Sequence, residues 1–207
     1  MNSYPKIYNI FIRDNNGKIL EGVYSLPQFE YLAQNQWVFT EKIDGTNVRF
    51  IWDGEDLLIR GKTEISTIPT FLYTKLLEYK ERLIKFLHNQ PPLCLYGEGF
   101  GAKIQTEGKN YIADGVDFIL FDVKTQNLWQ NREVVEDYAN RLGLKVVPIV
   151  GEGSIPDAIA KVKGGFISSF GDFFAEGIIA KPKIPLFNRG GNLIVTKIKH
   201  KDFYRGY

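Results

Sequence analysis

Polar turns divide the sequence into short apolar runs, and this pattern limits the fold more than any other feature. Most runs are too short for a helix and are rich in Val, Ile, Phe and Tyr, as strands are. The segments 13–18 (RDNNGK) and 52–56 (WDGED) contain Asn-Gly and Asp-Gly, which favour tight hairpins. We therefore predict mainly antiparallel sheet, with strands in residues 6–12, 37–43, 47–52, 56–61, 92–99, 117–123, 145–150, 174–181 and 192–200.

Helical spacing of apolar residues occurs in only three places. Residues 69–89 carry Leu72, Leu76, Leu83 and Leu87 on one face, and residues 132–142 and 154–163 show shorter patterns of the same kind. Strands joined by hairpins with a few added helices predict an α+β fold. The length of 207 residues suits one domain, which we expect to span residues 1–207.

Composition excludes several protein classes. Hydrophobic residues make up 44% and charged residues 24%, as in ordinary soluble proteins. No apolar run approaches the ~18 residues of a membrane span, and the N-terminus lacks a signal-peptide pattern, so we expect a cytoplasmic protein. The single cysteine, Cys94, excludes an internal disulfide and a multi-cysteine metal site, and its apolar surroundings predict a core position.

Charge is unevenly distributed along the chain. The net charge is only +2, but residues 177–207 contain seven Lys or Arg and one acid, a local charge of +6 that leaves −4 for the remainder. Such a basic segment favours a surface that binds phosphate groups, although a solvated basic tail would have the same composition.

The stretch EKIDGTN, residues 41–47, places Lys42 at the end of an apolar run. A lysine acts as a nucleophile only when part of it is deprotonated near neutral pH, which nearby cations favour. Strand alternation in residues 192–200 and beyond predicts Lys197, Lys199 and Lys201 on one face, so this segment can supply those cations. The alternative is an edge strand protected by lysines.

Three other strands end in polar groups. Glu98 lies between two glycines, where backbone can approach a ligand closely. Alternation predicts Phe121 and Asp122 on opposite faces of one strand. Glu176 precedes Gly177 and an apolar triplet that leads to Lys181. Taken singly, each segment is also compatible with an ordinary strand end followed by a turn glycine.

In order along the chain, EKIDGTN, LIRGK, YGEGFG, FILFDV, AEGIIAK and TKIKHK resemble the motifs of the covalent nucleotidyltransferases, the superfamily of polynucleotide ligases and mRNA capping enzymes. Thr46-Asn47 and the stretch GEGFGAKIQ are most similar to the RNA ligases, particularly their type 2 branch. The resemblance implies an adenylation domain of antiparallel sheets with flanking helices, ATP-grasp-like in architecture. Because the sequence ends at Tyr207, shortly after the last motif, we expect no C-terminal OB-fold.

The resemblance also implies residue roles. Lys42 would attack the α-phosphorus of ATP and become adenylylated, while Lys197 and Lys199 would bind the phosphates. Mg²⁺ or Mn²⁺ would contact Glu176, and Asp44 would orient the reacting loop. The remaining residues implied in nucleotide binding are Glu41, Asn47, Arg60 (ribose or phosphate), Glu98 (ribose), Phe121 (adenine stacking) and Lys181. Phe121 is preferred to Phe118 because the aromatic residue of the family precedes an Asp.

The implied reaction is the ATP-dependent joining of RNA 3′-OH and 5′-phosphate ends through lysyl-AMP and an adenylylated 5′-end, with Asn47 and the basic C-terminal residues contacting the strand. Three alternatives stay open: a minimal single-domain ATP-dependent DNA ligase, a GTP-using capping enzyme, and a catalytically silent nucleic-acid-binding module. A protein partner could supply the missing substrate-binding domain. A domain stripped down in this way is what a virus or phage could encode.

Overall fold

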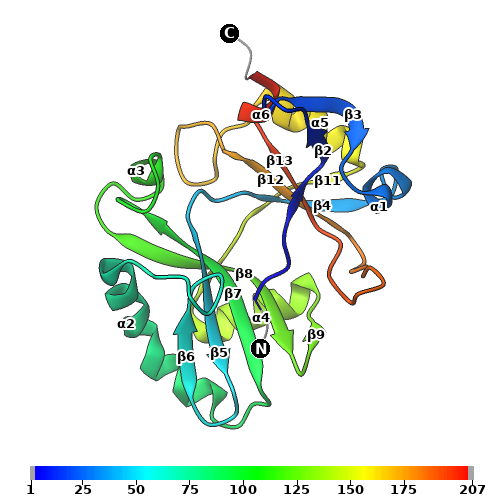
Figure 1. Cartoon of the computed structure of the whole chain (residues 1–207). Helices are drawn as coiled ribbons and strands as arrows, with labels where there is room; N and C mark the ends of the chain where they lie inside the picture. Colours follow the sequence, from blue (N-terminus) through cyan, green and yellow to red (C-terminus); the bar gives the residue numbers. More distant parts are fainter. Residues whose placement is uncertain (1–2, 205–207) are drawn as a thin grey trace. The chain divides into compact units, whose positions relative to one another are not determined.

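A computed structural model describes residues 3–204 of the chain (Figure 1). Residue contacts divide these residues into two compact units. Unit 1 consists of residues 3–4 and Ile43–Val147, and unit 2 consists of Pro5–Lys42 and residues 148–204. The chain therefore passes between the units three times, after Tyr4, after Lys42 and after Val147. The expectation of one adenylation domain across residues 1–207 stays a prediction.

Unit 1 is built on a six-stranded sheet in the order β10-β8-β7-β5-β6, with β9 paired to β8. The hairpin predicted at 52–56 joins β5 to β6, and most pairs are antiparallel, but β10 runs parallel to β8. The strands are β5 (Thr46–Trp52), β6 (Leu57–Arg60), β7 (Leu93–Gly101), β8 (Val116–Thr125), β9 (Leu128–Trp129) and β10 (Lys145–Val146). The helices are α2 (Thr70–Leu87), α3 (Gly108–Tyr111) and α4 (Arg132–Leu142).

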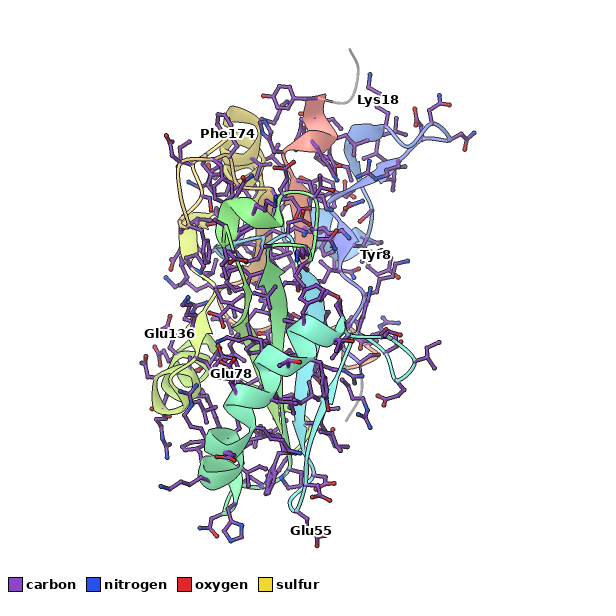
Figure 2. All side chains as sticks on the ribbon, turned by 90° about the vertical axis from the view of Figure 1, so that its left-hand side faces the viewer. Tyr8, Lys18, Glu55, Glu78, Glu136 and Phe174 are labelled. Atoms are coloured by element: carbon purple, nitrogen blue, oxygen red, sulfur yellow. The ribbon has the colours of Figure 1, made fainter. Side chains whose placement is uncertain are left out.

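The core of unit 1 lies between this sheet and helices α2 and α4. The four leucines predicted on one face of α2 are all fully buried there, against alternate residues of β5, β7 and β8. Burial of each such side chain contributes about 1.5–3 kcal/mol. Glu78 of α2 and Glu136 of α4 lie on the outer faces of their helices (Figure 2), with side chains 60% and 44% exposed. One face of the sheet is therefore covered by amphipathic helices.

Side chains that alternate with these core residues form the second face of the unit 1 sheet. This face carries the fully buried Arg49 and the rings of Tyr96 and Tyr4, which pack edge-on with centroids 5.4 Å apart. Cys94 is fully buried, as predicted, and burial raises the pKa of its thiol to about 12. Cys94 is thus a core residue in a thiol form that is a poor nucleophile.

Unit 2 is built on a five-stranded sheet in the order β1-β13-β12-β4-β11, beside a small β2-β3 hairpin. Most of its pairs are antiparallel, but β1 runs parallel to β13. The strands are β1 (Tyr8–Asn9), β2 (Phe11–Arg13), β3 (Ile19–Tyr24), β4 (Trp37–Glu41), β11 (Ile149–Gly153), β12 (Gly177–Pro182) and β13 (Thr196–Lys199). The helices are α1 (Pro27–Tyr31), α5 (Ile155–Gly164) and α6 (Lys201–Tyr204).

Helix α5 closes the core of unit 2 against one face of this sheet. Its start is fixed by a capping box, in which Ser154 and Asp157 satisfy each other's backbone N–H groups. Ile155, Ala158 and Val162 then pack against buried residues of β4, β12 and β13. Because those strand residues alternate, the intervening side chains lie on a second face of the sheet, away from α5.

The predicted α+β class and the three predicted helices are confirmed, with α4 spanning residues 132–142 as expected. Several short elements were missed: α1, α3, α6, β3 and β9 lack long apolar patterns. The run 6–12 is divided into β1 and β2, and the run 192–200 contributes only four residues to β13. In the described part of the chain, no helix is both long and apolar enough to cross a membrane.

Gly97 offers a test of the unit 1 packing. A Cβ atom at this position would lie 2.2 Å from the Phe118 ring and 2.4 Å from the backbone oxygen of Ile119. We expect Gly97→Ala to lower the free energy of unfolding by about 1–3 kcal/mol, because the core must shift to admit the methyl group. Urea denaturation measures the change.

The matched control is Gly164→Ala at the end of α5, where an added Cβ meets no atom within 4 Å. This variant should be as stable as the parent chain or slightly more so, because Ala favours the helix. Equal stability of the two variants would show that the strand spacing at Gly97 is not tight.

Candidate active site

Three charged side chains of unit 2 form an ion bridge. The Nζ atom of Lys42 lies 2.5 Å from Oε2 of Glu176, and Nζ of Lys199 lies 2.7 Å from Oε1 of the same carboxylate. The three side chains are only 14–20% exposed. Partial burial weakens solvent screening, so each charge depends strongly on the other two. The Lys42–Glu176–Lys199 ion bridge is the central feature of the candidate site.

Strand register brings these residues together from distant parts of the chain. Lys42 follows the last residue of β4, and its backbone N–H donates to the carbonyl oxygen of Gly177 at the start of β12. Gly177 in turn pairs with Lys199 of β13. Gly177 has φ +152°, and an added Cβ would lie 2.1 Å from the Ile198 oxygen. A glycine is therefore required beside Glu176 for β12 and β13 to approach this closely.

The two lysines determine the ionisation of Glu176. Burial alone raises the pKa of this carboxyl group, but the charge of Lys42 and the hydrogen bonds from Lys199 and Lys42 outweigh burial. The pKa of Glu176 therefore lies below its ordinary value of 4.5. At neutral pH the site holds a carboxylate between two ammonium groups.

Lys197 and Lys181 lie on the second face of the unit 2 sheet. Lys197 and Lys199 alternate with the buried Thr196 and Ile198 in β13, as predicted. Lys181 alternates with buried Ala180 in β12, whose residue Ile179 pairs with Lys197. Three of the lysines predicted to bind the nucleotide, Lys181, Lys197 and Lys199, thus share one face.

Lys201 does not share this face of the sheet with Lys181, Lys197 and Lys199. The strand ends at Lys199 and Lys201 begins α6, so the expected alternation stops before it. Arg205, the last basic residue of the C-terminal segment, lies outside the described residues.

Glu41 is a buried anchor within unit 2. Its carboxylate accepts a hydrogen bond from the Ser168 hydroxyl at 2.5 Å and one from the Ser169 backbone N–H at 2.8 Å. These bonds hold the segment before β12 against the end of β4, next to Lys42. The structure thus gives Glu41 a positioning contact, and its assignment to nucleotide binding stays a prediction.

In unit 1, Asn47, Arg60 and Glu98 occupy the second face of the sheet. Asn47 of β5 and Glu98 of β7 are direct register partners. Asn47 alternates with buried Val48, and Arg60 alternates with buried Ile59. The Oδ1 atom of Asn47 is buried and has no hydrogen-bond partner among the described residues. A buried amide oxygen without a donor is uncommon and marks a place where a ligand donor fits.

The glycines beside Glu98 serve packing, contrary to our expectation of room for a ligand. An added Cβ would meet Phe118 at Gly97 and Leu72 of α2, at 2.5 Å, at Gly99. Both glycines therefore let core side chains approach β7 from the α2 side. The expectation was wrong because Glu98 and its neighbouring glycines lie on opposite faces of the strand.

Phe121 is the extra residue of a β-bulge. Tyr96 pairs with Asp122 and the following Gly97 pairs with Leu120, so Phe121 has no register partner in β7. Tyr4 packs edge-on against Phe121 at 5.0 Å and donates a hydrogen bond to Asp122 at 2.5 Å. The predicted placement of Phe121 and Asp122 on opposite faces is therefore wrong, because the bulge interrupts alternation.

Phe118 differs clearly from Phe121. Its side chain is 1% exposed and packs edge-on against Phe50, 5.0 Å away, in the core under α2. Phe121 is half-buried and lies outside this core. Of the two rings, only that of Phe121 lies away from the α2 side, and the choice of Phe121 for adenine stacking stays a prediction.

Arg60 and Asp44 complete the predicted set. Nε of Arg60 lies 3.8 Å from Glu64, which also accepts a hydrogen bond at 2.9 Å from the buried Arg49. The backbone N–H of Asp44 donates to the Tyr111 hydroxyl at 3.2 Å. Both predicted residues therefore lie in unit 1, whereas Lys42, one residue before the unit boundary, lies in unit 2.

Sequence reasoning missed the supporting residues Tyr4, Arg49 and Ser168. Tyr4 and Ser168 lie far along the chain from the groups that they contact, and no local motif marks them. Arg49 interrupts the apolar run of β5, and a charged residue in a central strand was a usable signal for a buried side chain with polar partners. These three residues act through hydrogen bonds and ring contacts on the candidate residues or their neighbours.

The ion bridge predicts a specific pH dependence of stability. We expect Glu176→Gln to lower the free energy of unfolding at pH 7 by about 1–3 kcal/mol, because two ammonium groups lose their carboxylate. Since folding lowers the pKa of Glu176, its ionised form stabilises the protein above about pH 4.5, and this contribution is lost as the pH falls through the lowered pKa. Urea titrations should therefore show that the free energies of unfolding of the parent chain and of Glu176→Gln become more similar below that pH.

Glu152→Gln is the matched control. Glu152 pairs with Lys183 at 2.7 Å, but both side chains are 42–57% exposed, so the change should be small at every pH. If Glu176→Gln lowered the free energy of unfolding by the same amount throughout the acidic range, this account of the ion bridge would be contradicted.

Comparison with known proteins places this geometry in a family. A family model described as RNA ligase matches residues 35–199, more than half of the chain. Solved structures of the Naegleria gruberi RNA ligase match 96–99% of this chain at 18–19% identity, among them a mutant with AMP and Mn (TM-score 0.69), an apo mutant (0.68) and a form with PPi (0.66). The chain spans 57%, 59% and 62% of those three chains. These likenesses show the fold, and the family model shows membership: the chain belongs to the RNA ligase family of covalent nucleotidyltransferases.

Proposed function

We propose that this chain is an ATP-dependent RNA ligase that works through a covalent lysyl-AMP on Lys42. The observation that carries the proposal is the Lys42–Glu176–Lys199 ion bridge. Residues 134 positions apart in sequence meet there, at the position where the family motifs require a nucleophile, a carboxylate and a phosphate-binding lysine. A surface lysine with no catalytic role would not require a carboxylate and a second lysine from distant parts of the chain beside it.

In the first step Lys42 Nζ attacks the α-phosphorus of ATP. The Lys42 ammonium group first gives up one proton to water, and the neutral amine then forms the P–N bond. The bond between the α-phosphorus and the bridging oxygen breaks, pyrophosphate leaves, and a second proton passes from the nitrogen to water. Lys197 and Lys199 donate hydrogen bonds to phosphate oxygens whose negative charge grows in the transition state, which is where fixed cations accelerate a reaction most. Glu176 holds Lys42 and Lys199 in place before ATP binds.

The residues present fit a divalent cation that is bound mainly through phosphates. No group of three or more His, Cys, Asp or Glu residues converges in residues 3–204, and Glu176 is the carboxylate at the site. Mg²⁺ commonly keeps several waters and takes one or two carboxylates together with substrate phosphates. Such a cation would be held by Glu176 and would neutralise phosphate charge.

The second face of the unit 1 sheet suits the nucleoside. Glu98 can accept hydrogen bonds from ribose hydroxyls, and the buried Oδ1 atom of Asn47 beside it can accept one more. The bulge at Phe121 orients a ring out of the regular strand pattern, and aromatic rings stack on bases. We therefore assign ribose recognition to Glu98 and Asn47 and adenine stacking to Phe121, with Arg60 beside them for a ribose or phosphate contact.

In the later steps AMP passes from Lys42 to the 5′-phosphate of a strand, and a 3′-OH then displaces AMP and seals the ends. The fold relatives fit this scheme, since Naegleria gruberi RNA ligase is solved with ATP and Mn, with AMP and Mn, and with PPi. These are a substrate, a product fragment and the leaving group of the first step. A protein partner that adds RNA-binding surface belongs to this proposal.

Covalent nucleotide transfer is testable by intact mass. After incubation with ATP and Mg²⁺, the chain should gain the mass of one AMP, and Lys42→Ala should gain none. Lys199→Ala should slow the gain by about 10²–10³-fold, the usual effect of removing one group that stabilises transition-state charge. GTP should give no adduct.

Lys18→Ala is the control for loss of an arbitrary lysine. Lys18 is exposed on the β2-β3 hairpin, and Figure 2 shows it at the outer edge of unit 2. This variant should accept AMP at the parental rate. Absence of an adduct with either nucleotide in the parent chain would refute the ligase proposal and favour a catalytically silent nucleic-acid-binding module.

The acceptor is tested with nicked duplexes that differ only at the 3′-OH strand. We expect sealing when this strand is RNA, since the family and the Thr46-Asn47 pair favour an RNA ligase. Product is measured by denaturing electrophoresis after incubation with ATP and Mg²⁺. Sealing of DNA ends alone would overturn the RNA assignment and favour the DNA ligase alternative.

A further inference from the structure

Three rings stand together where β13 ends in unit 2. Phe174 and His200 are nearly parallel, with ring centroids 5.9 Å apart and planes inclined by 6°. His200 also contacts Tyr204, whose ring centroid lies 4.6 Å away. Phe174 is 64% exposed and Tyr204 is 56% exposed. We call these three residues the ring ladder.

Backbone groups of unit 2 hold the ring ladder in place. The ring Nδ1 of His200 lies 2.8 Å from the carbonyl oxygen of Val162, and the Tyr204 hydroxyl donates to the carbonyl oxygen of Lys163. Both carbonyls belong to the last turn of α5, where oxygens lack helical partners. The ladder is therefore ordered by hydrogen bonds even though its outer rings remain exposed to solvent.

The ladder adjoins the ion bridge through the backbone. The N–H of His200 donates to the carbonyl oxygen of Glu176 at 2.9 Å, and Phe174 precedes Glu176 by two residues. His200 directly follows Lys199, which holds the Glu176 carboxylate. Glu176 and Lys199, which belong to the proposed reaction site, thus also fix the backbone position of His200 in the ring ladder.

Local charge favours a polyanion over an apolar partner. Lys201 follows His200, is exposed, and forms no ion pair within residues 3–204. Among nearby acids, Asp202 is buried in an ion pair with Arg13 at 2.6 Å, the exposed Glu21 is paired with Lys163 at 2.7 Å, and Asp172 is exposed. Exposed rings with a neighbouring unpaired cation are the combination that binds single-stranded nucleic acid.

We propose that the ring ladder is a stacking platform for an unpaired base of the RNA strand whose end is being joined. This inference rests on the proposed function, because it assigns a substrate contact to the same unit that carries Lys42. Phe174 presents its outer ring face to the base, His200 supports that ring from behind, and Lys201 attracts the adjoining phosphate. Figure 2 shows Phe174 on one side of unit 2 and Lys18 on the other, so the outer ring of the platform lies away from the hairpin residue used as a control.

RNA binding by the full chain tests the platform. Fluorescence anisotropy with a labelled single-stranded oligoadenylate RNA would be measured for the parent, Phe174→Ala and Phe174→Trp. Loss of one stacked base should raise Kd by about 5- to 150-fold in Phe174→Ala. Phe174→Trp should bind within about threefold of the parent, because its ring can stack as well.

Tyr31→Ala is the matched control, since Tyr31 is an exposed ring of unit 2 at 86% exposure but lies on α1 beside Glu30. Its affinity should equal that of the parent. Attachment of AMP, a step that uses no RNA, is measured for every protein and reports on the nucleotide site separately. If the parent fails to take up AMP, the proposed function fails whatever the RNA affinities show.

If the parent takes up AMP but Phe174→Ala binds the RNA as tightly as the parent, the platform is refuted and the proposed function survives. The same conclusion follows if Phe174→Trp binds as weakly as Phe174→Ala, because stacking would then not explain the loss. A ladder covered by a protein partner would give the first of these two results.

Discussion

The proposed chemistry depends on one carboxylate held between two ammonium groups. Glu176 directly precedes β12, which pairs with β4 on one side and β13 on the other, and it binds Lys42 just after the end of β4 and Lys199 of β13. A partly buried carboxylate with one lysine would still leave the second lysine uncompensated, which is costly away from water. The ion bridge therefore ties the electrostatics of the site to the strand order of the whole sheet in unit 2.

Backbone contacts around the ion bridge hold its three charged residues in position. Gly177 lets β12 and β13 approach, and Glu41 fastens the segment before β12 to the end of β4 through Ser168 and Ser169. Each contact fixes a backbone position and leaves the charged side chains to be oriented by one another. In the proposed reaction, substrate phosphates would replace the carboxylate as the partner of the lysines, and the sheet would not need to rearrange.

Much of this arrangement could be predicted from the sequence because its signals are local. Leucine spacing identified α2, turn residues identified the β5-β6 hairpin, and alternation placed Lys197 and Lys199 on one face of β13. The order of motifs then identified the family. What local patterns could not supply was register between distant strands, on which the contacts of Tyr4 and Ser168 depend.

Two expectations failed for the same physical reason. The glycines beside Glu98 and the alternation of Phe121 with Asp122 were both judged from one strand alone, whereas the neighbouring strand and helix decide both cases. Lys201 was likewise placed by extending a strand that the structure ends at Lys199. A strand's pattern gives the direction of a side chain only while pairing stays regular.

The bulge at Phe121 has a consequence for how this protein can change. Deletion of Phe121 would let β8 pair regularly with β7 and would restore a continuous row of hydrogen bonds between the two strands. The same deletion would remove the ring that we assign to adenine stacking. Regular strand pairing and the proposed nucleotide recognition therefore oppose each other at a single residue, and we expect a variant shortened at this point to have lost its stacking contact with adenine.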